Sequence, residues 1–173
     1  MSPDKMWKLP PKAKIYEALT ALADGRVEFF GTHSARVVSS SHDRSYEVRW
    51  SDGMRTITAN DNASHWQGYM GYPIIAVLLK AGAIPYSSQI AEMLRGIPWK
   101  DLNERFKRNY DKAVEYILQH LDGGDDARAA IIREVDSIFD ALGRLDLRRG
   151  PRLPCPAARD TSNPPPDQSE NPA

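Results

Sequence analysis

The chain has 173 residues, of which 41% are hydrophobic, and this length and composition suit one ordinary globular domain with its own core. Its 23 lysines and arginines are balanced by 23 aspartates and glutamates, which excludes polyanion binding through overall charge, so any nucleic-acid site must be a local patch. The longest apolar run, residues 73–79, is far shorter than the roughly 20 residues that a transmembrane helix needs.

The N-terminal part predicts one helix followed by a small antiparallel sheet. Apolar residues in 12–23 recur at the spacing of an amphipathic helix, and Gly25 stands where that helix should end. The period then changes to two in four short segments that are rich in β-branched and aromatic residues and separated by turn formers. The alternating residues are Val27 and Phe29, Ala35 and Val37, Tyr46, Val48 and Trp50, and Ile57 and Ala59.

Helices are predicted for the rest of the ordered chain. Aliphatic residues after Tyr72 face every side of a helix, which indicates a buried one, and Ser87 or Ser88 can cap a short helix after it. The apolar spacing then predicts one long helix over 101–121 and another over 126–142. Glycines separate these two, so we expect an αα-hairpin.

The predicted fold class is therefore α+β, with an N-terminal helix, a sheet of about four strands and a buried helix, followed by the αα-hairpin. The last residues are rich in proline, serine, asparagine and aspartate and cannot bury enough apolar surface to offset their ordering entropy, so we expect a disordered tail. The predicted units are an N-terminal arm (1–11), an α+β module (12–83), a helical extension (84–147) and the tail (148–173).

Three short motifs in residues 14–79 resemble the SWIM-type zinc-finger family. They are Ala-Asp-Gly-Arg-Val at 23–27, Tyr-Glu-Val at 46–48, and Gly-Tyr-Pro-Ile-Ile-Ala-Val-Leu-Leu at 71–79, and they occur in the family's order with Asp61 on the family's aspartate. The resemblance implies a ββα module that binds DNA or protein, often within proteins that handle DNA.

This chain departs from the family's pattern at every zinc ligand. The four ligand positions hold Ile57, Ala59, Gly71 and Pro73, none of which can coordinate zinc. The resemblance thus implies a metal-free descendant, in which we expect buried aromatic side chains to replace the metal. The aromatic residues at that place are Trp66, Tyr69 and Tyr72.

The polar loop at residues 60–67 and two nearby arginines are the candidate partner-binding residues. The set comprises Arg49, Arg55, Asn60, Asp61, His65 and Gln67. The competing interpretation is structural: asparagine and aspartate satisfy turn backbone, Trp66 belongs to the core, and interleaved charges form a solvated face.

These patterns predict a non-enzymatic binding module with a protein or DNA partner, in a DNA-associated assembly. One alternative is a protein-interaction adaptor that docks through the αα-hairpin, and another is a small enzyme that uses Asp61 and His65. No catalytic residue, cofactor, metal or membrane partner is expected. The first residues lack a secretory signal and Cys155 is the single cysteine, so we expect a cytoplasmic protein.

Overall fold

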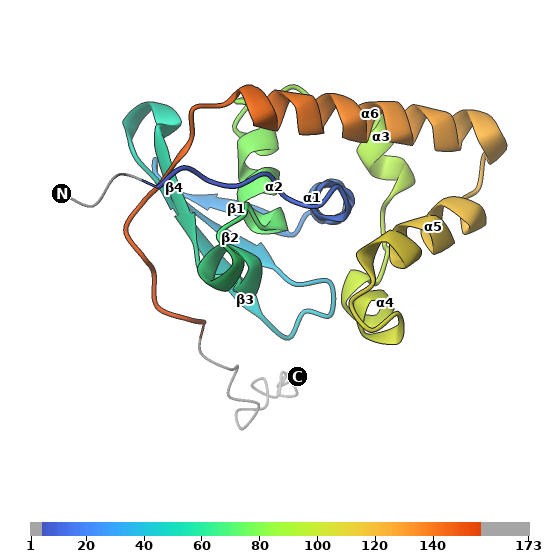
Figure 1. The fold of residues 1–173 in the computed structure, drawn as a ribbon, viewed down its shortest axis with the longest axis horizontal. Helices are drawn as coiled ribbons and strands as arrows, with labels where there is room; N and C mark the ends of the chain where they lie inside the picture. The colour runs from blue at the N-terminus through green and yellow to red at the C-terminus, as the bar shows by residue number, and fades with distance from the viewer. Residues whose placement is uncertain (1–4, 157–173) are drawn as a thin grey trace, which may run out of the picture.

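The computed structural model describes residues 5–156 and shows a sheet beside a group of helices (Figure 1). In chain order its elements are α1 (Ala13–Ala23), β1 (Val27–Phe30), β2 (Ser34–Val38), β3 (Ser45–Trp50), the short helix η1 (Asp52–Met54), β4 (Thr56–Ala59), the π-helical turn η2 (Ala63–Gln67), α2 (Tyr72–Lys80), α3 (Ser88–Met93), α4 (Trp99–Arg105), α5 (Tyr110–His120), α6 (Gly124–Arg144) and β5 (Arg148–Arg149). The α+β class predicted from the sequence is confirmed.

Helix α1 lies at the centre of the molecule and packs against α2, α3, α5 and α6, as its end-on position in Figure 1 shows. Nearly every side chain of α1 is buried, including Ile15 and Leu19 at 0% exposure. The helix ends as the sequence predicts, because Gly25 adopts the left-handed conformation at φ +69° that glycine tolerates best. This burial also encloses two charged residues of α1, Lys14 and Glu17.

The sheet has the strand order β1-β2-β3-β4-β5, and its first four strands are antiparallel, as predicted. Its inward-facing residues alternate along each strand and pair across the sheet, with Val27 opposite Val37 and Val48 opposite both Ala35 and Ala59. Helix α2 contacts β3 and β4, and its residues Pro73–Leu79 are buried, as expected for an aliphatic helix inside the core.

Both ends of the described chain add to one edge of this sheet. Strand β5 pairs parallel with β4, and Met6 forms an antiparallel bridge to Arg148. The indole of Trp7 is buried and donates a 3.0 Å hydrogen bond to the carbonyl oxygen of Ile57. The sequence assigns residues 148–156 to the disordered tail and 5–11 to an arm, but both segments pack on the sheet; residues 157–173 of the predicted tail lie outside the described residues.

The helical part differs from the prediction at one place. Ser87 caps α3 as expected, since its Oγ accepts a 3.3 Å hydrogen bond from the Ile90 amide. The long helix expected over 101–121 is instead two helices, α4 and α5, because Lys107 and Arg108 adopt left-handed backbone conformations at φ 50° and 62°. Asn109 then caps α5 by accepting a 3.2 Å hydrogen bond from the Lys112 amide.

Helices long and apolar enough to cross a membrane do not occur among residues 5–156.

Candidate ligand-binding cleft

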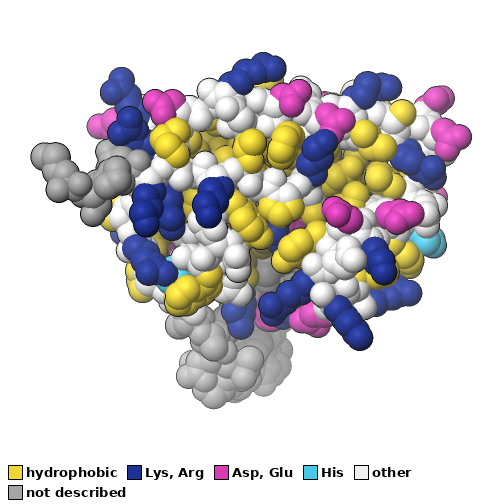
Figure 2. All heavy atoms as spheres, in the orientation of Figure 1, with side chains coloured by type: hydrophobic (Ala, Val, Ile, Leu, Met, Phe, Trp, Pro, Cys, Tyr) yellow, Lys and Arg dark blue, Asp and Glu magenta, His cyan; other side chains and the backbone are white. Residues whose placement is uncertain are grey.

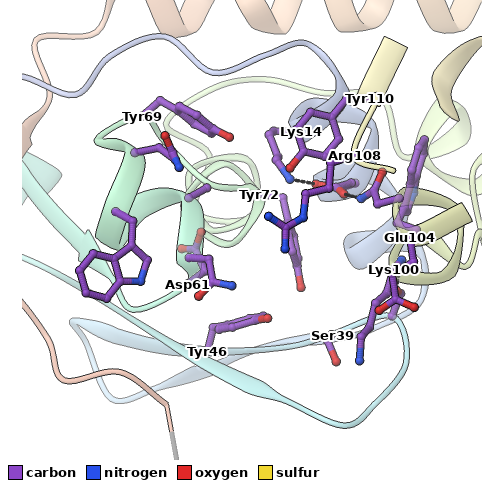
Figure 3. A pocket seen from close by; sticks show the side chains of 18 of the residues that line it. Lys14, Ser39, Tyr46, Asp61, Tyr69, Tyr72, Lys100, Glu104, Arg108 and Tyr110 are labelled. Atoms are coloured by element: carbon purple, nitrogen blue, oxygen red, sulfur yellow. Dashed lines mark hydrogen bonds and ion pairs between the residues drawn. The ribbon is translucent and has the colours of Figure 1, made fainter. Parts of the chain in front are cut away.

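A cleft of about 880 Å³ lies between α1, the η2 turn, the β2–β3 hairpin and the turn that joins α4 to α5 (Figure 3). This volume is typical of a site for a small molecule. Its lining residues come from five separate segments and are rich in tyrosine and in charged groups: Lys14, Glu17, Arg26, Ser39, Ser40, Tyr46, Asp61, Asn62, Ala63, Trp66, Gln67, Tyr69, Tyr72, Trp99, Lys100, Asn103, Glu104, Lys107, Arg108 and Tyr110.

The floor of the cleft is a buried ion pair on α1. Lys14 Nζ lies 2.9 Å from Glu17 Oε2, and the two side chains are only 10% and 6% exposed. The other carboxylate oxygen of Glu17 accepts a 2.6 Å hydrogen bond from the Asn103 amide, and the Lys14 ammonium lies 4.4 Å from the centre of the Tyr110 ring. Burial alone would lower the pKa of Lys14. The charge of Glu17 and its hydrogen bond raise that pKa by more than burial lowers it, so the pKa lies above its ordinary value and Lys14 stays charged.

One wall of the cleft is formed by Asp61, which follows β4 and is 5% exposed. Its Oδ2 accepts a 3.1 Å hydrogen bond from the Ser64 amide, and the Ser64 hydroxyl oxygen accepts one of the same length from the Gly71 amide. Its Oδ1 is buried and has no hydrogen-bond partner among the residues described. Burial raises the pKa of the Asp61 carboxyl, although the bonds from Ser64 oppose that shift. The wall therefore presents an unsatisfied acceptor.

Replacing Asp61 with asparagine should change how stability depends on pH. A carboxyl whose pKa is higher in the folded than in the unfolded protein binds its proton more readily when folded, so its contribution to the free energy of unfolding falls as pH rises above about 3.8. The Asp61→Asn variant lacks this decline, so it should gain stability relative to wild type as pH rises from about 3.8 through the folded-state pKa of Asp61, as urea denaturation at a series of pH values would measure. A difference between the two proteins that does not vary with pH would contradict the assignment.

Two tyrosines adjoin this wall. Tyr46 on β3 and Tyr72 at the start of α2 meet edge to face with ring centroids 6.2 Å apart. Burial raises the pKa of both phenols, and the proximity of Tyr46 adds to the upward shift at Tyr72. Both hydroxyls therefore stay protonated at neutral pH, and each can donate a hydrogen bond to a ligand.

The rim opposite is the α4–α5 turn, where Lys107 and Arg108 lie side by side. Its strained backbone is held by hydrogen bonds from the amides of Lys107 to the Glu104 carbonyl at 3.0 Å and of Arg108 to the Asn103 carbonyl at 2.7 Å. Neither side chain forms an ion pair with a carboxylate in the part of the chain that the structure describes. In Figure 3 the Arg108 side chain extends into the middle of the cleft, beside Tyr72.

The N-terminal end of α4 is fixed to the β2–β3 hairpin. The Lys100 amide donates a 3.0 Å hydrogen bond to the Ser40 hydroxyl oxygen, and the Lys100 ammonium pairs with Asp43. At the same end, the buried Arg26 guanidinium pairs with Asp24 at 3.1 Å. Both cations are thus already neutralised by carboxylates, which leaves Lys107 and Arg108 as the basic lining groups without such a partner among the described residues.

Of the six residues predicted from the sequence, only Asp61 and Gln67 line the cleft. Asn60 is buried and structural: its Oδ1 accepts a 2.8 Å hydrogen bond from the Glu47 amide, and its side-chain amide donates one of 3.1 Å to the Pro154 carbonyl. Arg49 is exposed and pairs with Glu47, and Arg55 is exposed after η1.

His65 does not share the cleft with Asp61. Its ring stacks edge to face on Trp66 with centroids 4.5 Å apart, and its Nε2 lies 3.5 Å from the Cys155 sulfur, on the side of the returning C-terminal segment. Trp66 itself is 65% exposed, so both the core position and the role in an aromatic plug expected for it are wrong. Tyr69 and Tyr72 are half-buried in the cleft lining.

Sequence reasoning missed Lys14, Glu17, Lys107 and Arg108. A signal existed on α1, where charged residues at positions i and i+3 occur in a helix that is apolar enough to be buried on all sides. The turn residues gave no such signal, because the apolar spacing continues through them from Leu102 to Ile117. Within residues 5–156, no group of three or more histidine, cysteine, aspartate or glutamate side chains is arranged to hold a metal ion.

Comparison with known proteins gives one family match. The model of the family described as uncharacterised conserved protein UCP014422 matches residues 7–148, while no curated protein and no solved structure matches the chain. The match covers most of the chain and overturns the SWIM-type resemblance: the motifs that suggested it are a helix end, a short strand and an aliphatic helix, which many α+β proteins share once the zinc ligands are removed. The chain belongs to the UCP014422 family.

Proposed function

We propose that this protein is a non-enzymatic binding module that holds a small anionic ligand in the cleft. The observation that carries the proposal is Arg108, whose side chain extends into the cleft from a strained turn without a carboxylate partner among the described residues (Figure 3). A guanidinium offers five donors in a planar fork that suits carboxylate and phosphate oxygens.

The surroundings of Arg108 support an anion more than a cation at this place. Lys107 adjoins it on the same turn, and the phenols of Tyr46 and Tyr72 are donors across the cleft. Glu104 and Asp111 are the acidic residues nearest to the turn in sequence. Asp111 does not line the cleft, and Figure 3 shows the Glu104 side chain beside Lys100 rather than beside Arg108. An anion at the centre of the cleft therefore meets donors from two sides.

Titration with inorganic pyrophosphate tests this function. Wild-type protein should bind pyrophosphate, and Arg108→Ala should bind it about 10- to 100-fold more weakly, because hydrogen bonds to charged groups contribute about 1.5–3 kcal/mol. Isothermal titration calorimetry at fixed ionic strength measures both constants.

Arg55→Ala and Arg133→Ala are matched controls, since each removes one exposed arginine that does not line the cleft. Both should bind pyrophosphate like wild type. Equal weakening by all three substitutions would mean that only the overall charge attracts the anion, and absence of binding to wild type would reject the proposed function.

A second candidate function is the adaptor role, and an observation favours it. A groove of about 530 Å³ runs between α1, α5 and α6, and it is lined in part by Val114, Leu118 and the 39% exposed Ile132. Hydrophobic side chains are visible at the surface in this region of Figure 2. If pyrophosphate fails to bind, this groove becomes the leading candidate for a partner surface.

A further inference from the structure

Asp61, on the wall opposite Arg108, indicates which chemical group the other end of the ligand has. Asp61 is 5% exposed, and its Oδ1 has no hydrogen-bond partner among the described residues, although buried polar atoms in folded proteins nearly always have one. An unpaired buried carboxylate oxygen is costly, and a ligand that donates an N–H or O–H group to it would remove that cost. The ligand is therefore expected to present a hydrogen-bond donor at the end remote from its anionic group.

The aromatic lining indicates the shape of that donor-bearing end. Tyr46 and Tyr72 adjoin Asp61, and Trp66 stands at the rim with 65% of its surface exposed. The Arg152 guanidinium lies 5.2 Å from the centre of the Trp66 ring. An exposed aromatic side chain at the edge of a cleft is a stacking surface, and flat heterocycles stack on such rings without regard to their substituents.

The position of Asp61 is built into the fold rather than being accidental. A Cβ atom added to Gly71 would lie 2.0 Å from Asp61 Oδ2, so the chain has glycine where the carboxylate needs space. Ser64 fixes the same oxygen from the other side by a backbone hydrogen bond. Oδ1 is thereby the carboxylate oxygen of Asp61 that has no hydrogen-bond partner among the described residues.

From these features we propose that the ligand is a nucleotide, with its phosphate on Arg108 and Lys107 and the N–H edge of its base on Asp61. This inference rests on the proposed function and specifies its substrate class. We take guanine as the test base, because its ring N–H and its exocyclic amino group lie side by side and either can donate to Asp61 Oδ1. The same chemistry occurs in a free nucleotide and at the 5′-phosphorylated end of a single strand.

The test compares ligands that share the phosphate but differ in the base. Wild-type protein should bind GMP about 10- to 100-fold more tightly than ribose 5-phosphate, and Asp61→Asn should abolish that difference while leaving ribose 5-phosphate affinity unchanged. Trp66→Ala, at an exposed site where loss of folding is not expected, should also reduce the preference for GMP. Asp122→Asn, which removes an exposed carboxylate outside the cleft, should retain it.

Each outcome separates this inference from the proposed function. Equal affinity for GMP and ribose 5-phosphate, with both weakened by Arg108→Ala, would overturn the nucleotide assignment and keep the anion site. Absence of binding to GMP, ribose 5-phosphate and pyrophosphate alike would overturn both. A 5′-phosphorylated oligonucleotide beginning with guanosine distinguishes the sources: tighter binding than GMP supports a strand end, and weaker binding supports the free nucleotide.

Discussion

Replacing Gly71 with alanine should lower the free energy of unfolding by about 3 kcal/mol, at the upper end of what overpacking a buried site costs. The new Cβ would lie 2.0 Å from Asp61 Oδ2 and 2.7 Å from its Cγ, so the carboxylate would have to leave its position and lose the hydrogen bond from the Ser64 amide. The backbone at Gly71 has φ −70°, which alanine adopts readily, so the effect is steric. Urea denaturation measures it.

A double variant isolates the cause. Asp61→Ala combined with Gly71→Ala removes the clash, so the pair should be more stable than Gly71→Ala alone, giving a large coupling energy in a double-mutant cycle. Gly143→Ala is the control: its Cβ would make an ordinary 3.8 Å contact with Leu9, and replacing glycine inside α6 should stabilise the protein by about 0.5–1 kcal/mol. If the effects of Asp61→Ala and Gly71→Ala on the free energy of unfolding simply add, the contact between Asp61 and Gly71 is disproved.

Replacing Lys14 with methionine should destabilise the protein by about 3–5 kcal/mol, because it leaves the Glu17 carboxylate buried without its cation. The pKa of Lys14 is raised in the folded protein, so its stabilising contribution is complete below about pH 10 and is lost as pH rises through the folded-state pKa. The full effect is therefore expected at pH 7, where thermal or urea denaturation measures it.

The residue just before the same helix supplies the matched control for Lys14. Lys12 pairs with Asp136 at 2.8 Å, but both side chains are about half exposed, so Lys12→Met should cost less than about 1 kcal/mol. Combining Lys14→Met with Glu17→Leu removes both buried charges and should recover much of the lost stability. Equal effects of the Lys12 and Lys14 substitutions would show that the Lys14–Glu17 pair is not buried in solution.

The elements that local pattern determines were predictable from the sequence. The first helix, the four antiparallel strands, the buried α2 and the Ser87 cap all follow from spacing and capping residues, and all are confirmed. Strand β5 was not predictable, since two arginines before a proline-rich segment carry no strand signal. Its pairing comes from the position of the β4 edge in the folded molecule.

The cleft was only partly predictable, for a physical reason at the α4–α5 turn. The apolar spacing from Leu102 through Phe106 to Tyr110 fits a continuous helix, and neither Lys107 nor Arg108 is a residue type that favours a left-handed backbone. The Asn109 cap was the available signal, and it was weaker than the periodicity. Asp61 was identified as a candidate, but its burial against Gly71 and its place in one cleft with Arg108, 47 residues further along the chain, arise only on folding.

The most direct test of the central claim is an NMR titration of ¹⁵N-labelled protein with pyrophosphate, which locates the bound anion. We expect the shifted amide signals to belong to the α4–α5 turn around Arg108 and to the segment from Asp61 to Gly71, and we expect the Arg108→Ala variant to lose these shifts. Shifts confined to the groove around Ile132, or spread over exposed lysines and arginines with no preference for the cleft, would contradict it.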